Sequence, residues 1–390
     1  MKILSITPFL RGAPFHPTSG GKSAISLKVT NALLDERHQV FVLPWSKEYI
    51  HEETRFLTNG SSKIASGLPT MFIPGPKRLT TRLAKAFINP EAWKNPKHTV
   101  WKEFREGIYD KGYFLKRAIK RSKPDIVHAH YTHSDIAQFY RDGGFPNPFV
   151  LTHHSKGVSN SIPLYDHVVF ISHFQYQQAR SIYPDVEDRH SVIHNCVDNA
   201  YMGRINPEES NKILYLSNIT HGKGLDILLN SFAQSPDLDK FHLDVIGIGE
   251  LLTPLKEFVK NHDLRNVTFL GRLSIEENIR RMEDSSLFVV PSRGEGFGVI
   301  YMEALCSGLP IIGFPQTVRE LNEMLGIEVG YEFDANNESS KKLADIIEKA
   351  MSSKLTRLGY RKEMMKRARK LFSYDTFRNK YLNLYQKLAN

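Results

Sequence analysis

The sequence predicts an α/β protein made of two doubly wound domains with parallel sheets. The chain has 390 residues, which is more than one hydrophobic core usually organises. Short apolar runs alternate with helix-like stretches, a pattern typical of parallel sheets flanked by helices. This alternation pauses near residue 198 and restarts at residue 212. We therefore expect an N-terminal domain over 1–198, a C-terminal domain over 199–372 and a last helix within 373–390.

The N-terminal half opens with a β-α-β pattern. Residues 2–7 and 39–43 have the composition of short buried strands, and they flank a helix-like stretch over 23–36. Three further apolar runs are predicted strands, 125–129, 148–152 and 167–171. This order predicts a parallel sheet, because parallel neighbours need long crossover connections.

The C-terminal half repeats the pattern. Residues 212–218 form a predicted strand, followed by a helix-like stretch from Gly224 to Gln234. Four more strands are predicted, 241–247, 266–271, 286–292 and 309–314. Near the end, apolar and aromatic side chains recur at helical spacing, Phe377, Tyr381, Leu384, Tyr385 and Leu388. They predict a helix that docks back on the N-terminal domain.

Composition excludes several classes of protein. Apolar residues make up 41% and charged residues 24%, values typical of soluble globular chains and not of disordered or fibrous ones. Cys196 and Cys306 form neither a disulfide framework nor a paired metal site, which favours a reducing compartment such as the cytoplasm. The first apolar run breaks at Pro8 without a cleavage site, and no run reaches the roughly 18 apolar residues of a membrane span.

Positive charge is concentrated in one segment. The net charge is +10, and residues 77–123 hold fourteen Lys or Arg against four Asp or Glu. Aromatic residues such as Trp93 and Trp101 lie between these cations, a mixture that suits an anionic membrane surface. A solvated basic face is the alternative. Nucleic-acid binding is disfavoured, because no recognisable nucleic-acid module accompanies the charge.

The densest functional signal is PSRGEGFGVIYMEALCSGLP, residues 291–310. A Gly-rich turn follows a strand and enters a helix expected to begin near Phe297 or Gly298. The unpaired N–H groups and positive dipole end of such a helix favour phosphate. Glu295 precedes the helix and Glu303 lies near its second turn, and carboxylates suit sugar hydroxyls. Taken alone, Glu303 fits a solvated helix residue better, since Glu is a favoured helix former.

This stretch resembles the signature of glycosyltransferase family 4, which has two glutamates separated by seven residues. The matching positions are Pro291, Ser292, Glu295, Gly296, Phe297, Gly298, Glu303, Ala304, Gly308 and Pro310. The resemblance implies the GT-B fold, in which two Rossmann-like domains face each other across a cleft. It also implies metal-independent sugar transfer with retention of configuration, from a nucleotide-diphosphate sugar of UDP or GDP type.

The resemblance assigns roles to the donor side. Glu295 would hold donor-sugar hydroxyls and Glu303 the ribose hydroxyls. The turn and the first helical turn would bind diphosphate and sugar through Gly296, Phe297, Gly298, Val299 and Ile300.

A second segment, residues 217–232, is similar to the family's G-R-x-x-x-x-K-G segment. Lys223 and Gly224 match, and Lys223 would stabilise the leaving diphosphate. Asn218 stands where the family has Arg. Arg272, after the strand at 266–271, is a candidate to compensate.

A third patch, Gly20 and Gly21, resembles the family's Gly-rich loop near donor phosphate and acceptor, although an ordinary helix-entry turn is the alternative. His16 stands where a Walker motif needs Gly, so that nucleotide site is rejected.

Histidines form the other candidate group. By resemblance to the family's T-x-H segment, His154 would line the cleft, with catalytic or acceptor-side contacts. His130 is a second acceptor-side candidate, with a structural histidine as the alternative. A zinc site of His128 and His130 is disfavoured, so no metal is expected. Residues 192–200 resemble the family's interdomain hinge.

The family resemblance, together with these features, implies a retaining hexosyltransferase in cell-envelope polysaccharide or glycoconjugate synthesis. Catalysis would depend on Glu295, His154 and Lys223, with a nucleotide sugar as co-substrate and no cofactor. The acceptor would be a glycan or lipid-linked molecule, and the protein would be cytoplasmic or peripheral on the inner membrane face. Alternatives are a non-catalytic membrane-associated scaffold, a nucleotide-sugar epimerase or a glycosyl phosphorylase.

Overall fold

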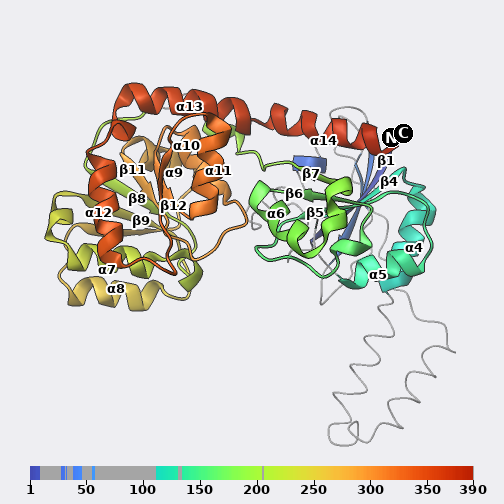
Figure 1. Ribbon diagram of the computed structural model, residues 1–390, viewed down its shortest axis with the longest axis horizontal. Coiled ribbons are helices and arrows are strands. Elements are labelled where there is room, and N and C mark those ends of the chain that lie inside the picture. Colours follow the sequence, from blue (N-terminus) through green and yellow to red (C-terminus); the bar gives the residue numbers. More distant parts are fainter. Residues whose placement is uncertain are drawn as a thin grey trace, which may run out of the picture.

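The computed structural model describes residues 1–8, 28–30, 32, 38–45, 55–57, 111–130, 134–203 and 206–389. Figure 1 shows two lobes side by side, each built around a sheet with helices on both faces. The N-terminal lobe carries the first sheet and the C-terminal lobe carries the second. The predicted fold class, two α/β units with doubly wound sheets, is confirmed.

The N-terminal sheet has the strand order β3-β2-β1-β4-β5-β6-β7. Its strands are β1 (Lys2–Pro8), β2 (Gln39–Trp45), β3 (Arg55–Leu57), β4 (Ile126–Ala129), β5 (Phe149–His153), β6 (His167–Phe170) and β7 (His190–Val192). All neighbours pair in parallel except β3, which is antiparallel to β2. The helices described here are α4 (Lys111–Ser122), α5 (Ser134–Asp142) and α6 (His173–Ile182).

The C-terminal sheet is parallel throughout, in the order β10-β9-β8-β11-β12-β13. Its strands are β8 (Lys212–Leu216), β9 (His242–Ile246), β10 (Val267–Gly271), β11 (Leu287–Val289), β12 (Ile311–Gly313) and β13 (Gly330–Glu332). The helices are α7 (Leu225–Gln234), α8 (Leu252–Asn261), α9 (Ile275–Glu283), α10 (Val299–Cys306), α11 (Pro315–Leu325), α12 (Ser340–Met351), α13 (Leu358–Phe372) and α14 (Tyr374–Ala389).

The strands predicted from apolar runs all exist, with ends that differ by a few residues. Sequence analysis missed β3, β7 and β13, which read RFL, HSV and GYE. Each is three residues long and includes a polar or charged residue, whereas the equally short β11 and β12 lie within longer apolar runs that could be detected. Of the helix expected over 23–36, the structure describes residues 28–30 and 32 as helical.

The last two helices connect the lobes. In Figure 1, α13 lies on the C-terminal lobe and α14 crosses to the N-terminal lobe, so that the two chain ends lie close together. Tyr381 and Tyr385 of α14 are buried in a cluster with Ile3, Ile126 and Val150 of the first sheet. The Tyr385 hydroxyl hydrogen-bonds the His128 ring, and the Tyr381 hydroxyl lies 3.1 Å from Thr152 Oγ1. The helix therefore packs on the N-terminal sheet.

Within the described part of the chain, no helix combines the length and apolar character needed to cross a membrane.

Candidate active site

The Gly-rich turn lies where β11 ends and α10 begins. Gly298 precedes α10 with φ of +75°, and a Cβ there would lie 2.7 Å from the Tyr301 ring. Only glycine fits this position comfortably. Val299 and Ile300 form the first helical turn, whose backbone N–H groups lack partners within the helix. The expected helix start near Gly298 is confirmed, and the turn presents N–H donors at the carboxyl edge of the sheet.

Glu295 forms an ion pair with Lys223, which it faces from the Gly-rich turn. Its carboxylate is 6% exposed, accepts a 2.7 Å hydrogen bond from Ser292 Oγ and contacts Lys223 Nζ. The Lys223 side chain stays about one-fifth exposed, at 21%. Sugar hydroxyls could bind the carboxylate and phosphate the ammonium, because each group prefers a ligand of that chemistry.

The loop that carries Lys223 is fixed to the Gly-rich turn. Arg293 pairs with Asp226 through two hydrogen bonds of 2.9 and 2.6 Å, and its backbone N–H donates to Gly222 O at 3.0 Å. Gly224 has φ of +70°, and a Cβ there would lie 1.9 Å from the Pro291 carbonyl oxygen. Residues 221–224 and 291–295 are therefore one packed unit.

The Gly-rich turn also contacts the N-terminal lobe. Ser172 Oγ donates to Gly296 O at 2.9 Å, and a Cβ on Gly296 would lie 3.0 Å from Gln175 Nε2 and 3.9 Å from His154 O. Gln175 Nε2 in turn donates to Ser155 O at 2.7 Å. The structure thus brings the His154 segment beside the turn that carries Glu295.

Lys156 is a functional candidate that sequence analysis missed. It follows β5, in the same loop as His154, and its Nζ lies 3.8 Å from the position of a Cβ on Gly222. Burial lowers the pKa of Lys156, Glu295 opposes this effect, and Lys223 adds to it. The only sequence signal was its place two residues after His154.

Glu303 lies apart from the Lys223–Glu295 pair. Burial raises its pKa to about 7, Lys28 and a hydrogen bond from Tyr201 act in the opposite direction, and Asp198 adds to the rise. Tyr201 and Asp198 belong to the segment that connects the lobes, and Lys28 belongs to the N-terminal lobe. A solvated helix position, the alternative considered for Glu303, is wrong.

The other predicted donor residues occupy different settings. Asn218 and Arg272 are exposed after β8 and β10. Among the described residues, no hydrogen bond or ion pair joins either side chain to Lys223 or Glu295. Phe297 is buried with its ring 4.8 Å from that of His194. Gly20 and Gly21 lie outside the described residues, as does most of the basic segment 77–123.

Three histidines form a row that leads toward the site. The His128 and His130 rings are fully buried with centroids 4.1 Å apart, and the His130 and His154 centroids are 6.3 Å apart. The two ring nitrogens of His128 contact Tyr385 OH and Thr152 Oγ1. His128 thus has structural partners, and His130 is the link between it and His154.

These buried rings predict a loss of stability in acid. Burial lowers the pKa of His128 to about 3 and that of His130 well below its usual value. The unfolded chain, in which histidine has a pKa near 6.5, binds more protons than the folded chain below that pH. We expect the thermal midpoint to fall steadily as pH decreases from about 6.5 toward 3, and His130→Asn to flatten this dependence. A variant of the exposed His262 is the control, and an unchanged slope in His130→Asn would contradict the prediction.

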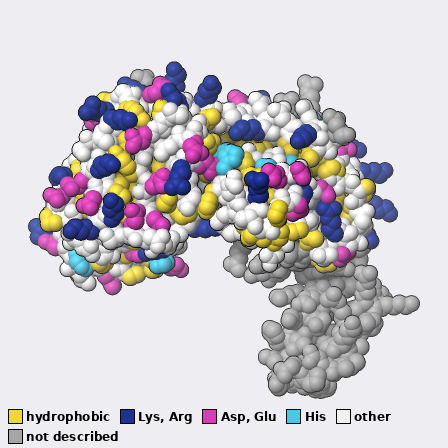
Figure 2. Space-filling model, in the orientation of Figure 1, with side chains coloured by type: hydrophobic (Ala, Val, Ile, Leu, Met, Phe, Trp, Pro, Cys, Tyr) yellow, Lys and Arg dark blue, Asp and Glu magenta, His cyan; other side chains and the backbone are white. Residues whose placement is uncertain are grey.

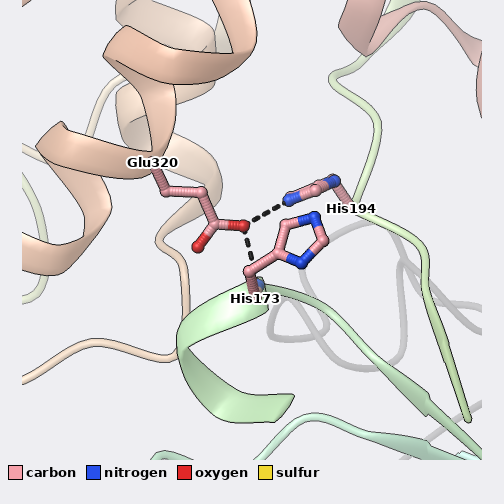
Figure 3. A group of neighbouring side chains, drawn as sticks. All are labelled: His173, His194 and Glu320. Carbon is pink, nitrogen blue, oxygen red and sulfur yellow. Dashed lines mark hydrogen bonds and ion pairs between the residues drawn. The ribbon is translucent and has the colours of Figure 1, made fainter. Parts of the chain in front are cut away.

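The carboxylate of Glu320 forms hydrogen bonds between the two lobes, beside the site. Figure 3 shows Glu320 of α11 pointing at His194 and at the start of α6, which begins at His173. Its Oε1 accepts from His194 Nε2 at 2.6 Å and from the His173 backbone N–H at 2.7 Å, and Oε2 lies 3.4 Å from the Phe174 N–H. A negative charge here favourably caps the helix dipole of α6. Figure 2 shows histidine side chains where the lobes meet.

Among the described residues, the side chains of His173, His194 and Glu320 form a group that could bind a metal ion. Ligand atoms of His173, His194 and Glu320 lie within 4.8 Å of one another. The carboxylate already accepts hydrogen bonds from His194 and from α6. A bound cation would have to displace these donors, so the arrangement fits an interlobe contact better than a metal centre.

Two family models match nearly all of the chain. The model described as Glycosyltransferase Family 4 covers residues 20–201, and the model described as Glycosyl transferases group 1 covers residues 202–371. The resemblance noted from residues 291–310 is therefore confirmed over both halves of the chain.

Individual relatives are distant. An uncharacterised glycosyltransferase of Methanocaldococcus jannaschii is 27% identical over 212 residues, which cover 50% of this chain and 58% of that protein. A GDP-mannose-dependent monoacylated alpha-(1-6)-phosphatidylinositol monomannoside mannosyltransferase of Corynebacterium glutamicum is 30% identical over 118 residues, 26% of this chain and 30% of that protein. The chain thus spans less than two thirds of the length of these relatives.

The fold has solved counterparts over its whole length. The HepE protein of Anabaena, whose crystal structure contains UDP and glucose, matches with a TM-score of 0.62 at 16% identity, covering 99% of both chains. At this identity the likeness establishes the fold, and the expected GT-B architecture is confirmed.

Proposed function

Because the chain belongs to the family 4 glycosyltransferases with the GT-B fold, we propose that it transfers a hexose from a nucleotide-diphosphate sugar to a glycan or lipid-linked acceptor. The observation that carries the proposal is the ion pair of Lys223 with the buried Glu295 at the start of α10. Phosphate and sugar binding groups thus stand next to each other at a helix N-terminus, as a nucleotide sugar requires.

The proposal divides the donor and acceptor between the lobes. The donor would lie on residues 199–372, with Glu295 on the sugar, Lys223 and the first turn of α10 on the diphosphate, and Glu303 on the ribose. The acceptor would lie on residues 1–198, near Gly20, His130 and His154. Closure of the lobes around both substrates would assemble the site.

The chemistry we propose is retention of configuration without a metal or other cofactor. The support is the match of residues 291–310 to the family signature. The leaving diphosphate would be stabilised by Lys223 and by helix N–H groups, which act where negative charge develops. The anomeric configuration of the product, determined by NMR, tests retention.

A donor titration tests the proposal first. Wild-type protein is titrated calorimetrically with UDP, GDP and ADP sugars in EDTA at pH 8, above the raised pKa of Glu303 of about 7. We expect one nucleotide sugar to bind, and Glu303→Ala to abolish that binding by removing the ribose contact. Glu348→Ala is the control, because Glu348 is a helical glutamate that pairs with Lys240 away from the site. If no nucleotide sugar binds, the transferase proposal fails.

The proposal also covers the acceptor and the cellular location of the protein. We propose that the protein acts in cell-envelope polysaccharide or glycoconjugate synthesis, in the cytoplasm and at the inner face of the membrane. The Corynebacterium relative is named for a phosphatidylinositol mannoside, which supports a lipid-linked acceptor. Helix α4 buries Leu115 and Ile119 and exposes Lys116 and Lys120, and Figure 2 shows Lys and Arg side chains over that side of the lobe.

Vesicle binding tests the membrane contact. Neutralising the lysines and arginines of 77–123 is expected to reduce sedimentation with vesicles that contain phosphatidylglycerol, because each cation near such a surface contributes about 1 kcal/mol. Neutral phosphatidylcholine vesicles are the control. Equal sedimentation of wild type and variant with the anionic vesicles would remove the membrane contact from the proposal.

The alternatives differ in their products. A nucleotide-sugar epimerase would change the sugar without releasing nucleotide, and a phosphorylase would require inorganic phosphate. A non-catalytic scaffold would release no nucleotide diphosphate with any acceptor. The intact Lys223–Glu295 pair favours the transferase over the scaffold.

A further inference from the structure

The position of Lys156 is fixed by the interface between the lobes. Gln175 Nε2 donates to Ser155 O at 2.7 Å, and the same amide lies 3.0 Å from the position of a Cβ on Gly296. The loop that follows β5 is thus in contact with the Gly-rich turn. Lys156 leaves this loop toward Gly222, whose Cβ position lies 3.8 Å from the ammonium.

Two ammonium groups therefore lie in the neighbourhood of one carboxylate. Lys223 pairs with Glu295 from the C-terminal lobe, and Lys156 approaches the same groups from the N-terminal lobe. With one negative charge against two positive charges, the cluster of Lys156, Lys223 and Glu295 has an excess of one positive charge. The nearby start of α10 adds the positive end of a helix dipole.

Lys156 is also accessible to a ligand. Its side chain is exposed, whereas Glu295 is 6% exposed. A ligand with two or more negative charges can approach both ammonium groups, while a single carboxylate would compete with Glu295 for Lys223. The charge balance therefore favours a diphosphate.

We propose that Lys156 is a second diphosphate-binding residue, supplied by the lobe opposite the one that carries the rest of the donor site. This inference rests on the proposed function and deepens it. A diphosphate held between Lys156 and Lys223 bridges the lobes, so that donor binding favours the closed arrangement. Lys156 thereby couples donor binding to acceptor binding. The loop that follows β5 carries both Lys156, for the donor, and His154, for the acceptor.

The test compares Lys156→Met with Lys156→Arg and with Lys120→Met, an exposed lysine of α4 in the same lobe. Uridine, UMP, UDP and inorganic pyrophosphate, and the guanosine series, are titrated calorimetrically at two salt concentrations. We expect Lys156→Met to weaken nucleoside diphosphate and pyrophosphate binding about tenfold, since a charge-assisted hydrogen bond is lost. Nucleoside binding should stay unchanged, and the salt dependence of diphosphate binding should decrease. Arginine should restore most of the affinity.

The possible results of this test lead to different conclusions about the inference and the proposed function. If wild type binds a nucleoside diphosphate and Lys156→Met binds it equally well, this inference fails and the proposed function stands. If Lys156→Met weakens nucleoside and diphosphate equally, or Lys120→Met weakens diphosphate as much, Lys156 acts only on the shape or general charge of the lobe. If wild type binds no nucleoside diphosphate, the proposed function fails and the inference fails with it.

Discussion

Glu295→Gln is expected to lower sugar transfer from the donor about 100-fold without weakening the binding of free nucleoside diphosphate. The carboxylate is buried, accepts a 2.7 Å hydrogen bond from Ser292 Oγ and forms an ion pair with Lys223. An amide keeps the shape but removes the negative charge that holds sugar hydroxyls and stabilises positive charge on the reacting sugar. Loss of one such electrostatic contact typically costs about 10²- to 10³-fold in turnover.

The measurement is the rate of nucleotide release from the donor identified by titration, with and without acceptor. Glu332→Gln is the matched control, because Glu332 is a glutamate of the same lobe that pairs with Arg319 at 2.6 Å. Thermal unfolding of both variants separates catalytic from structural loss. The prediction is wrong if Glu295→Gln retains turnover, or if it loses free nucleotide and sugar nucleotide to the same extent.

The sequence predicted the parts of the site that lie within one segment. Glu295, the Gly-rich turn and the start of α10 lie within eight residues, and their spacing alone determines a strand, a turn and a helix N-terminus. Lys223 could be placed beside them only through the family resemblance. Its pairing with Glu295 depends on Gly224, which allows its loop to pack against the Pro291 carbonyl.

Contacts between distant segments could not be predicted. Glu320 meets His194 and the start of α6 across 126 and 147 residues of chain, and no local pattern specifies such a partner. Sequence analysis gave no role to Glu320, whose carboxylate faces the start of α6. Lys156 was missed for the same reason, because its position matters only when the lobes face each other.

Some short strands also could not be predicted from the sequence. Strand β13 pairs with β12 over Gly330, Tyr331 and Glu332 only. Unlike the equally short β11 and β12, it does not lie within an apolar run, so neither alternation nor hydrophobicity marks it. Such strands form because a neighbouring sheet edge offers hydrogen-bond partners. Their presence is therefore a property of the tertiary structure.

Arg361→Met is expected to destabilise the C-terminal lobe more than any surface substitution. The guanidinium is fully buried in α13 and donates to three backbone carbonyls, those of Gly308 at 2.6 Å, Glu208 at 2.5 Å and Ser285 at 2.8 Å. Burial lowers its pKa to about 10, so the charge is retained at neutral pH. Removing the donors leaves three carbonyls without partners, at a cost of about 3–5 kcal/mol.

The expected decrease in thermal midpoint is about 10 °C for a lobe of this size. Arg319→Met is the control, because Arg319 forms an exposed ion pair with Glu332, and such pairs contribute at most about 1 kcal/mol. Equal midpoints for the two variants would contradict the prediction. Since Gly308 lies two residues after the end of α10, Arg361 connects α13 to the helix whose other end carries the Gly-rich turn. Arg361→Met should therefore also weaken donor binding at temperatures below its own unfolding transition, which Arg319→Met should not.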